Sequence, residues 1–185
     1  MTNDETNKLS SMVLAPWIAK AIPLTGVPRF IGGNSFRHCF QTLGILLDYN
    51  YVDSVLLKTA VIHDLIEDLP HTTYEELRQI DNDSERVVAL LKEVTNVPKR
   101  PKAEFLNDIL HNGSREAKII KCADRIANLI DLQQVVIKDE TIIRTLYETK
   151  EYVYPMACQV NHYMSIEISD LINNKRKQLN MQICF

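Results

Sequence analysis

Apolar residues recur every three or four positions along most of the chain, which is the spacing of one face of an α-helix. In the first half of the chain this pattern predicts three long helices, at about residues 36–49, 53–69 and 84–96. A longer helical pattern covers about residues 140–173 and is expected to break at Pro155. Because the alternation typical of strands is almost absent, the sequence predicts an all-α, single-domain helical bundle of roughly eight helices.

The N-terminal residues are polar and differ in pattern from the rest. Residues 1–10 are predicted to form a flexible N-terminus, followed by one folded domain over residues 11–185. The first helix is expected to begin near Ser10 or Ser11 and to carry Trp17 into the core.

Turn-forming residues mark the loops between the predicted helices. Residues 23–35 contain two of the seven prolines and three of the five glycines, so they form a loop, with Ser35 as the predicted N-cap of the next helix. Thr72 and Glu75 have the spacing of a capping box. Two further segments are rich in cations and are predicted to be exposed to solvent: residues 96–102 and 175–177.

Length and composition exclude several classes of protein. The 185 residues suit one domain with its own core, and 45% apolar and 24% charged residues are ordinary for a folded globular protein. A net charge of −3 argues against a nucleic-acid partner, which would call for a strongly basic surface. The four cysteines lack CxxC spacing, no signal peptide is recognisable, and the apolar run 12–19 is too short to cross a bilayer. The sequence therefore predicts a cytoplasmic protein with no membrane partner.

Residues 61–69 carry the densest group of chemically active side chains. On a helix their apolar residues form one stripe, and the adjoining stripe consists of His63, Asp64, Glu67 and Asp68. Taken alone, this polar stripe fits the solvated side of an ordinary amphipathic helix better than a site. Its meaning depends on what the rest of the chain adds.

Residues 117–130 form the second informative stretch, which is predicted to be an amphipathic helix. Asp124 falls within or at the edge of its apolar face, and Asn128 follows one turn later. Burying an unpaired carboxylate costs several kcal/mol, so this position calls for a cation. A metal ion is one of the few cations that can lie in a core.

Three predicted helices together supply two imidazoles and two carboxylates: His38, His63, Asp64 and Asp124. This donor set suits a divalent ion such as Mn²⁺, Fe²⁺ or Zn²⁺ and leaves coordination positions for water and substrate. Such an ion lowers the pKa of bound water, and Glu67 and Asp68 are placed to transfer protons beside it. The pattern therefore predicts a metal-dependent hydrolytic site.

The order of these residues resembles the HD superfamily of metal-dependent phosphohydrolases. His63-Asp64-x-x-Glu67-Asp68 is similar to the sharper HDxxED motif of its RelA/SpoT-type alarmone hydrolases. Further segments resemble the same family: Glu93-Val94-Thr95, Lys121-Cys-Ala-Asp124-Arg-Ile-Ala-Asn128-Leu129, and Arg144 to Thr149 with Tyr154 to Ala157. The matches extend from about Arg29 to Ala157. Since a companion synthetase domain does not fit in 185 residues, the chain looks most like a small stand-alone alarmone hydrolase of the metazoan SpoT homologue type.

This resemblance implies an HD hydrolase domain that holds one ion, typically Mn²⁺, on His38, His63, Asp64 and Asp124. Glu67 and Asp68 would orient or deprotonate the attacking water. The nucleotide would be contacted by Asn128 and Arg144, by Arg29 on the base, and by the cationic loop around Lys99 and Arg100. The implied reaction releases pyrophosphate from the 3′ position of ppGpp or pppGpp and returns GDP or GTP, so the expected partner is a small nucleotide.

One segment departs from the family pattern. Phe36-Arg37-His38-Cys39 stands where the family usually has a Tyr-Ile pair before the first histidine and a proline after it. Arg37 has no counterpart there and is either a phosphate contact or a solvated helix residue. The departure keeps open an HD phosphatase for another nucleotide, such as the 2′-phosphate of NADPH or a deoxynucleotide 5′-phosphate.

A third interpretation is a non-catalytic helical regulatory module. The presence of all four ligand positions together with Glu67 and Asp68 argues against it, because such a module has no use for a costly buried Asp124. The sequence leaves open whether the protein forms a homo-oligomer.

Overall fold

The computed structural model describes residues 1–135 and 140–180. Within these residues no strand forms, and an isolated β-bridge joins Pro28 and Asn34. The all-α class is therefore confirmed. The chain divides into two compact units, Met1–Arg100 and Pro101–Phe185.

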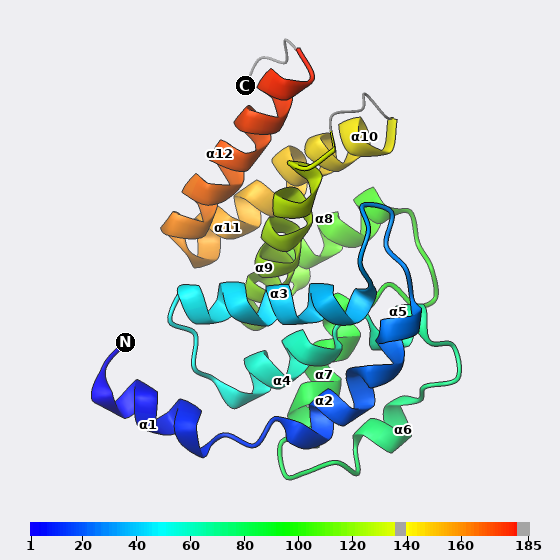
Figure 1. Ribbon diagram of the computed structural model, residues 1–185, viewed down its shortest axis with the longest axis vertical. Helices are drawn as coiled ribbons and strands as arrows, with labels where there is room; N and C mark the ends of the chain where they lie inside the picture. Colours follow the sequence, from blue (N-terminus) through cyan, green and yellow to red (C-terminus); the bar gives the residue numbers. More distant parts are fainter. Residues whose placement is uncertain (136–139, 181–185) are drawn as a thin grey trace. The chain divides into compact units, whose positions relative to one another are not determined.

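The described residues form twelve α-helices (Figure 1), more than the eight or so expected, mainly because two of the expected long helices are divided into shorter ones. The first unit contains α1 (Asn3–Ser11), α2 (Ala15–Ala21), α3 (Ser35–Asp48), α4 (Ser54–Ile62), α5 (Leu65–Asp68), α6 (Tyr74–Leu77) and α7 (Ser84–Val94), with a 3₁₀-helix at Ile22–Gly26. The second unit contains α8 (Lys102–Asn112), α9 (Arg115–Leu132), α10 (Glu140–Glu148), α11 (Tyr154–Val160) and α12 (His162–Gln178), with a π-helix at Thr149–Val153.

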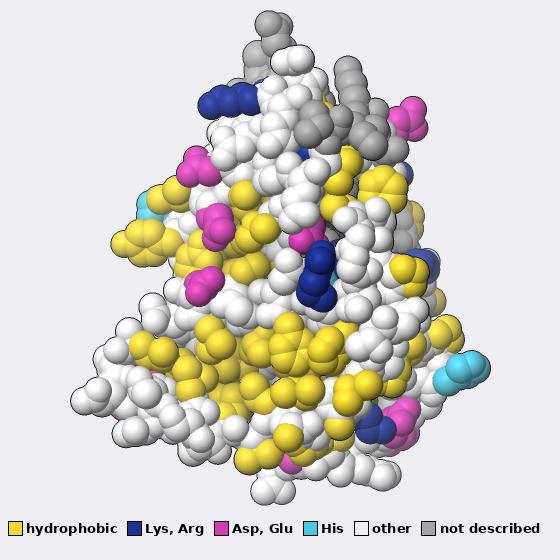
Figure 2. All heavy atoms as spheres, in the orientation of Figure 1, with side chains coloured by type: hydrophobic (Ala, Val, Ile, Leu, Met, Phe, Trp, Pro, Cys, Tyr) yellow, Lys and Arg dark blue, Asp and Glu magenta, His cyan; other side chains and the backbone are white. Residues whose placement is uncertain are grey.

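Helix α4 is the central helix of the first unit. All of its residues from Val55 to Ile62 are buried, as expected of a helix that is apolar on nearly every side. It packs against α2, α3 and α7 (Figure 1). Phe36 and Phe40 of α3 are only half-buried, and their ring centroids lie 4.6 Å apart. Figure 2 shows hydrophobic side chains gathered over α3 and α4. The packed pair holds His38 near the start of α3 and His63 directly after α4.

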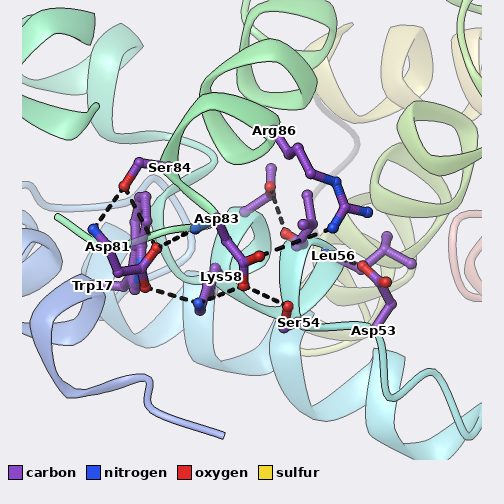
Figure 3. Close-up of polar contacts among 11 residues, drawn as sticks. Trp17, Asp53, Ser54, Leu56, Lys58, Asp81, Asp83, Ser84 and Arg86 are labelled. Carbon is purple, nitrogen blue, oxygen red and sulfur yellow. Dashed lines mark hydrogen bonds and ion pairs between the residues drawn. The ribbon is translucent and has the colours of Figure 1, made fainter. Parts of the chain in front are cut away.

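A buried lysine ties α4 to its neighbours (Figure 3). The Nζ atom of Lys58 donates to Oδ2 of Asp81 at 2.8 Å and to Oδ2 of Asp83 at 2.7 Å. Asp81 also accepts from the indole Nε1 of Trp17 at 2.8 Å, and Asp83 accepts from the hydroxyl of Ser54 at 2.6 Å. A charge in a core needs such partners. The network thereby joins α2 and α4 to the turn before α7.

The helix predicted over residues 53–69 is interrupted, so the prediction of one continuous helix is wrong. Helix α4 ends at Ile62, α5 begins at Leu65, and a turn at His63 and Asp64 separates them. The Nδ1 atom of His63 lies 2.9 Å from the carbonyl oxygen of Ala60, which in a continuous helix would accept from the backbone of Asp64. The turn lets both side chains face one space, which neighbours about 100° apart on a straight helix do less readily.

Two helix caps lie one residue from their predicted positions. The side chain of Asn34, rather than Ser35, caps α3, and the capping box of α6 joins Thr73 to Glu76, one residue after the predicted pair. Asn, Ser and Thr are all good caps, so adjacent candidates cannot be separated by propensity alone. The hydroxyl of Ser35 is thereby released for another contact.

The N-terminal segment also differs from its prediction. Helix α1 covers Asn3–Ser11, and the helix expected from Ser10 or Ser11 begins at Ala15 instead. Pro16 occupies the first turn of α2, where its missing N–H costs nothing. Trp17 is fully buried, as predicted.

In the second unit α9 packs against α11 and α12. Lys175 of α12 was predicted to be solvated, but it is completely buried. Its Nζ atom donates to the carbonyl oxygen of Leu132 at 2.5 Å and to that of Val135. The last carbonyls of a helix lack backbone partners and attract cations, so Lys175 caps the C-terminal end of α9.

The long C-terminal pattern does not break at Pro155, so this prediction is wrong. Pro155 lies in the first turn of α11, which follows the π-helical turn directly. The break comes at Asn161, whose side chain accepts from the backbone of Tyr163 and Met164 and caps α12. A strong cap ends one helix and starts the next more effectively than a proline placed in a first turn.

Among the described residues no helix combines the length and apolar character needed to cross a bilayer. Cys39, Cys122 and Cys158 are free thiols. The cytoplasmic location stays a prediction.

Candidate metal centre

Two buried histidines meet in the first unit. His38 and His63 are 1% and 2% exposed, and their ring centroids lie 5.2 Å apart with an interplanar angle of 62°. His38 lies in the first turn of α3, whereas His63 follows the last residue of α4. The packing of α3 on α4 therefore brings together two residues that are 25 positions apart in the chain.

Asp64 faces both imidazoles. Its Oδ1 lies 3.3 Å from Nε2 of His63, and its Oδ2 lies 3.8 Å from Nε2 of His38. The carbonyl of Ala60 can only accept a hydrogen bond, so the Nδ1 atom of His63 carries the proton in the neutral ring and Nε2 presents its lone pair. A lone pair and a carboxylate oxygen repel unless a proton or a metal cation lies near both. The donors thus fit a divalent ion, and a carbonyl on Nδ1 is the usual support of a ligating histidine.

A thiol lies beside this group and was missed as a candidate ligand by the sequence argument. The ligand atoms of Cys39, His63 and Asp64 all lie within 4.8 Å of one another, and Cys39 is completely buried. The available signal was its position directly after His38 in α3. Thiolates favour softer ions such as Zn²⁺, whereas imidazole and carboxylate also accept Mn²⁺.

Glu67 and Asp68 lie on α5, and each has a different partner. Oε1 of Glu67 accepts from the backbone N–H of Asn96 at 2.8 Å. Oδ2 of Asp68 accepts from the hydroxyl of Ser35 at 2.6 Å. Burial raises the pKa of Asp68 above its ordinary value, and the charges of Asp64 and Glu67 raise it further. The bond from Ser35 opposes this rise, as does the positive charge of Arg29.

The Gly-rich loop presents Arg29 to the metal ligands. Nη1 of Arg29 lies 3.5 Å from Oδ2 of Asp64. The loop closes through a bond from the backbone N–H of Arg29 to the carbonyl of Gly33 at 3.2 Å, and both Gly32 and Gly33 have positive φ angles. A Cβ atom on Gly33 would lie 2.6 Å from the guanidinium carbon of Arg37, but this flexible end can shift, so glycine is favoured there chiefly by the positive φ angle.

Arg37 and Lys99 are exposed candidates for substrate contacts. Arg37 donates from Nη2 to the carbonyl of Gly32 at 3.2 Å, so it supports the loop in this structure. Lys99 lies in the segment between α7 and α8, where the side-chain amide of Asn96 donates to the carbonyl of Arg100 at 2.9 Å and accepts from its N–H at 3.0 Å. This basic loop is therefore anchored at its first residue.

In the second unit Asp124 lies on α9 with partners of its own. Its Oδ2 lies 2.8 Å from Nζ of Lys121, and its Oδ1 accepts from Nδ2 of Asn128 at 2.6 Å. The sequence argument that Asp124 calls for a cation holds, but a lysine one turn earlier on the same helix already supplies one. Arg144, the remaining substrate candidate, is exposed on α10.

Comparison with known proteins identifies relatives, although no family model matches the chain. Over 83 residues it is 30% identical to "Guanosine-3′,5′-bis(diphosphate) 3′-pyrophosphohydrolase MESH1" of Xenopus tropicalis, and over 85 residues it is 33% identical to the protein of the same name in Danio rerio. Each match covers 44% of this chain and 46% of the relative. A "Probable guanosine-3′,5′-bis(diphosphate) 3′-pyrophosphohydrolase" of Mycoplasma genitalium is 25% identical over 191 residues, covering 91% of this chain and 25% of that protein.

A solved structure has the same fold. It is described as "A metazoan ortholog of SpoT hydrolyzes ppGpp and plays a role in starvation responses", and it superimposes with a TM-score of 0.75 at 20% identity over 90% of this chain and 96% of that one. The matches span less than half the length of the curated relatives. They confirm the resemblance to alarmone hydrolases drawn from the motifs, and the superposition confirms the helical fold.

Proposed function

We propose that this chain, which resembles guanosine-3′,5′-bis(diphosphate) 3′-pyrophosphohydrolases, hydrolyses the 3′-pyrophosphate of ppGpp or pppGpp and releases pyrophosphate with GDP or GTP. The observation that carries the proposal is the pair of buried imidazoles, His38 and His63, facing the carboxylate of Asp64. Glu67 and Asp68, one turn further on, add the groups that proton transfer requires. The names of the sequence relatives support the choice of substrate.

The ligands proposed for the ion are His38, His63, Asp64 and, from the second unit, Asp124. A bound divalent ion, for which Mn²⁺ is our choice, lowers the pKa of water and supplies a nucleophile near neutral pH. Asp124 is supported by its place in the family-like segment from Lys121 to Leu129 and by the two donors, Lys121 and Asn128, that hold its carboxylate in a defined orientation. Lys121 would then share Asp124 with the ion.

The other residues bind, orient or move protons. Glu67, held by a backbone N–H, orients the attacking water, and Asp68, whose pKa is raised by burial, exchanges a proton with it. Arg29 lies beside the ligands and is proposed to contact the base, while Asn128 and Arg144 contact the nucleotide. Lys99 and Arg37 are exposed cations, and we assign them to contacts with the phosphates because the substrate is anionic.

A nucleotide panel tests this function. Purified protein is incubated with ppGpp, pppGpp, NADPH and deoxynucleotide 5′-phosphates, with Mn²⁺ or with chelator, and His63→Ala serves as the matched inactive control. We expect pyrophosphate from ppGpp and pppGpp only with Mn²⁺ and only with the wild type. Intact ppGpp, or equal turnover by wild type and His63→Ala, would contradict the proposal.

A second candidate is an HD phosphatase for another phosphorylated nucleotide. The observation in its favour is the altered segment before His38. In this segment the side chain of Arg37 packs on Gly33 and donates a hydrogen bond to the carbonyl oxygen of Gly32. The same panel separates the two functions, because this candidate releases orthophosphate from NADPH or a deoxynucleotide and no pyrophosphate from ppGpp.

A further inference from the structure

Ser35 is a buried serine that none of the motifs includes. It is the first residue of α3 and is only 3% exposed. Asn34 caps the helix, so the hydroxyl of Ser35 is not needed as a cap and instead donates to Oδ2 of Asp68 at 2.6 Å. Its backbone N–H donates to the carbonyl of Val27 at 2.9 Å. Both polar groups of Ser35 therefore have defined partners, one in the Gly-rich loop and one on α5.

The two carboxylates of α5 are held in different ways. Glu67 accepts from a backbone N–H, which no substitution at Asn96 other than proline removes. Asp68 accepts from a side-chain hydroxyl, which a single substitution does remove. Asp64 and Glu67 are negative charges near Asp68, and Arg29 is the nearby positive charge, which already lies on Asp64. Ser35 is thus the neutral donor that orients Asp68 among like charges.

Ser35 also lies on the same helical face as a metal ligand. His38 follows it by three residues, and residues three apart on a helix are neighbours. One turn of α3 therefore carries both the first imidazole and the hydroxyl that holds Asp68. Any shift of α3 moves the hydroxyl of Ser35 and the imidazole of His38 together. The carboxylate of Asp68, held by Ser35, therefore keeps its position relative to His38.

We infer that Ser35 is a positioning residue that fixes the carboxylate of Asp68 relative to His38 for proton transfer. This role rests on the proposed hydrolase function. Misplacing a reacting group by about 1 Å can cost up to about a hundredfold in rate, so a lost hydroxyl is expected to affect turnover more than binding. The chemical step belongs to Asp68, and Ser35 acts through it.

The kinetic test compares Ser35→Ala with Ser54→Ala. The hydroxyl of Ser54 donates to Asp83 at the same 2.6 Å, within the same unit but in the Lys58 network, so it controls for the loss of an equivalent bond. We expect Ser35→Ala to lower kcat by about ten- to a hundredfold with KM within about twofold and an unchanged metal content. Ser54→Ala should keep wild-type kcat. An unchanged kcat in Ser35→Ala, or equal losses in both variants, would overturn the inference.

A second measurement does not depend on any substrate. The unfolding equilibrium constant is measured for Ser35→Ala, Asp68→Ala and the double variant. If the two side chains interact as inferred, Ser35→Ala raises this constant in the wild-type background and has a clearly smaller effect once Asp68 is alanine. Equal effects in both backgrounds would overturn the inference. Coupling in folding without hydrolysis of any nucleotide would instead show that the bond forms and that the proposed function is wrong.

Discussion

The Nδ1 atom of His63 lies 2.9 Å from the carbonyl oxygen of Ala60. This contact lies where α4 ends, and it leaves Nε2 as the ring nitrogen that faces Asp64. The neighbouring Asp64 then turns its carboxylate toward the same space, 3.3 Å from Nε2 of His63. The helix interruption and two of the candidate metal ligands therefore coincide in one turn of the chain.

The metal ligands and the proton-transfer groups have different proposed roles, and this difference gives a first prediction. Asp64→Ala should lose both the metal and turnover, because it removes a charged ligand. Glu67→Gln should keep the metal yet lose about a hundredfold or more of kcat, because the side chain still accepts from Asn96 but has lost its charge. Metal analysis of purified variants, together with nucleotide turnover, distinguishes the two effects. Asp48→Ala, on the exposed end of α3, is the matched control. Full activity of Glu67→Gln would show that the roles are assigned wrongly.

The thiol of Cys39 allows a second prediction about the identity of the ion. If imidazoles and carboxylates hold the ion, Cys39→Ser should bind the same amount of Mn²⁺ as the wild type. Equilibrium dialysis with Mn²⁺ and with Zn²⁺ measures this directly. A loss of Zn²⁺ binding in Cys39→Ser would instead identify the thiolate as a ligand and favour a softer ion.

The Lys58 network gives a third prediction, which concerns stability. Lys58→Met leaves Asp81 and Asp83 without their cation and should lower the free energy of unfolding by about 3 kcal/mol. Urea unfolding measures the change. Lys8→Met is the control, because the ion pair that Lys8 forms with Asp4 is exposed to solvent. This variant should change the free energy of unfolding by less than about 0.5 kcal/mol.

The same network predicts a pH dependence. Burial tends to raise the pKa of Asp81, but hydrogen bonds from Lys58 and Trp17 outweigh it, and the bond from Lys58 lowers the pKa of Asp83. Both pKa values lie below the ordinary 3.8, so the stabilisation is complete above about pH 4 and is lost as the pH falls further. Unfolding measured from pH 6 downward should therefore show a shallower acid loss in Lys58→Met than in the wild type. Equal slopes in the two proteins would contradict this assignment.

Lys121 and Asp124 allow a fourth prediction, which tests the proposed ligand of the second unit. Lys121→Met removes the cation that lies 2.8 Å from Asp124, so the protein without metal should lose about 2 kcal/mol of stability. If Asp124 is also a metal ligand, Mn²⁺ should raise the melting temperature of Lys121→Met more than that of the wild type. Calorimetry with and without Mn²⁺ measures both effects. Equal shifts would argue against Asp124 as a ligand.

The sequence alone determined the helical class and supplied the list of candidate site residues. Helical periodicity and motif spacing are local properties, so they could be read without knowing any contact. The pairing of Lys121 with Asp124 was also within reach, since residues three apart on a helix are neighbours. The sequence argument considered only a metal for that carboxylate.

Only the tertiary structure decided how the candidate residues of the first unit meet. It placed His38 against His63 through the packing of α3 on α4, directed the hydroxyl of Ser35 to Asp68, and joined the buried Lys58 to Asp81 and Asp83. These contacts join residues 23 to 33 positions apart in the chain. Periodicity shows which face of each helix is buried, but the partner of a side chain depends on how helices pack and where they break, and no local pattern contains that information.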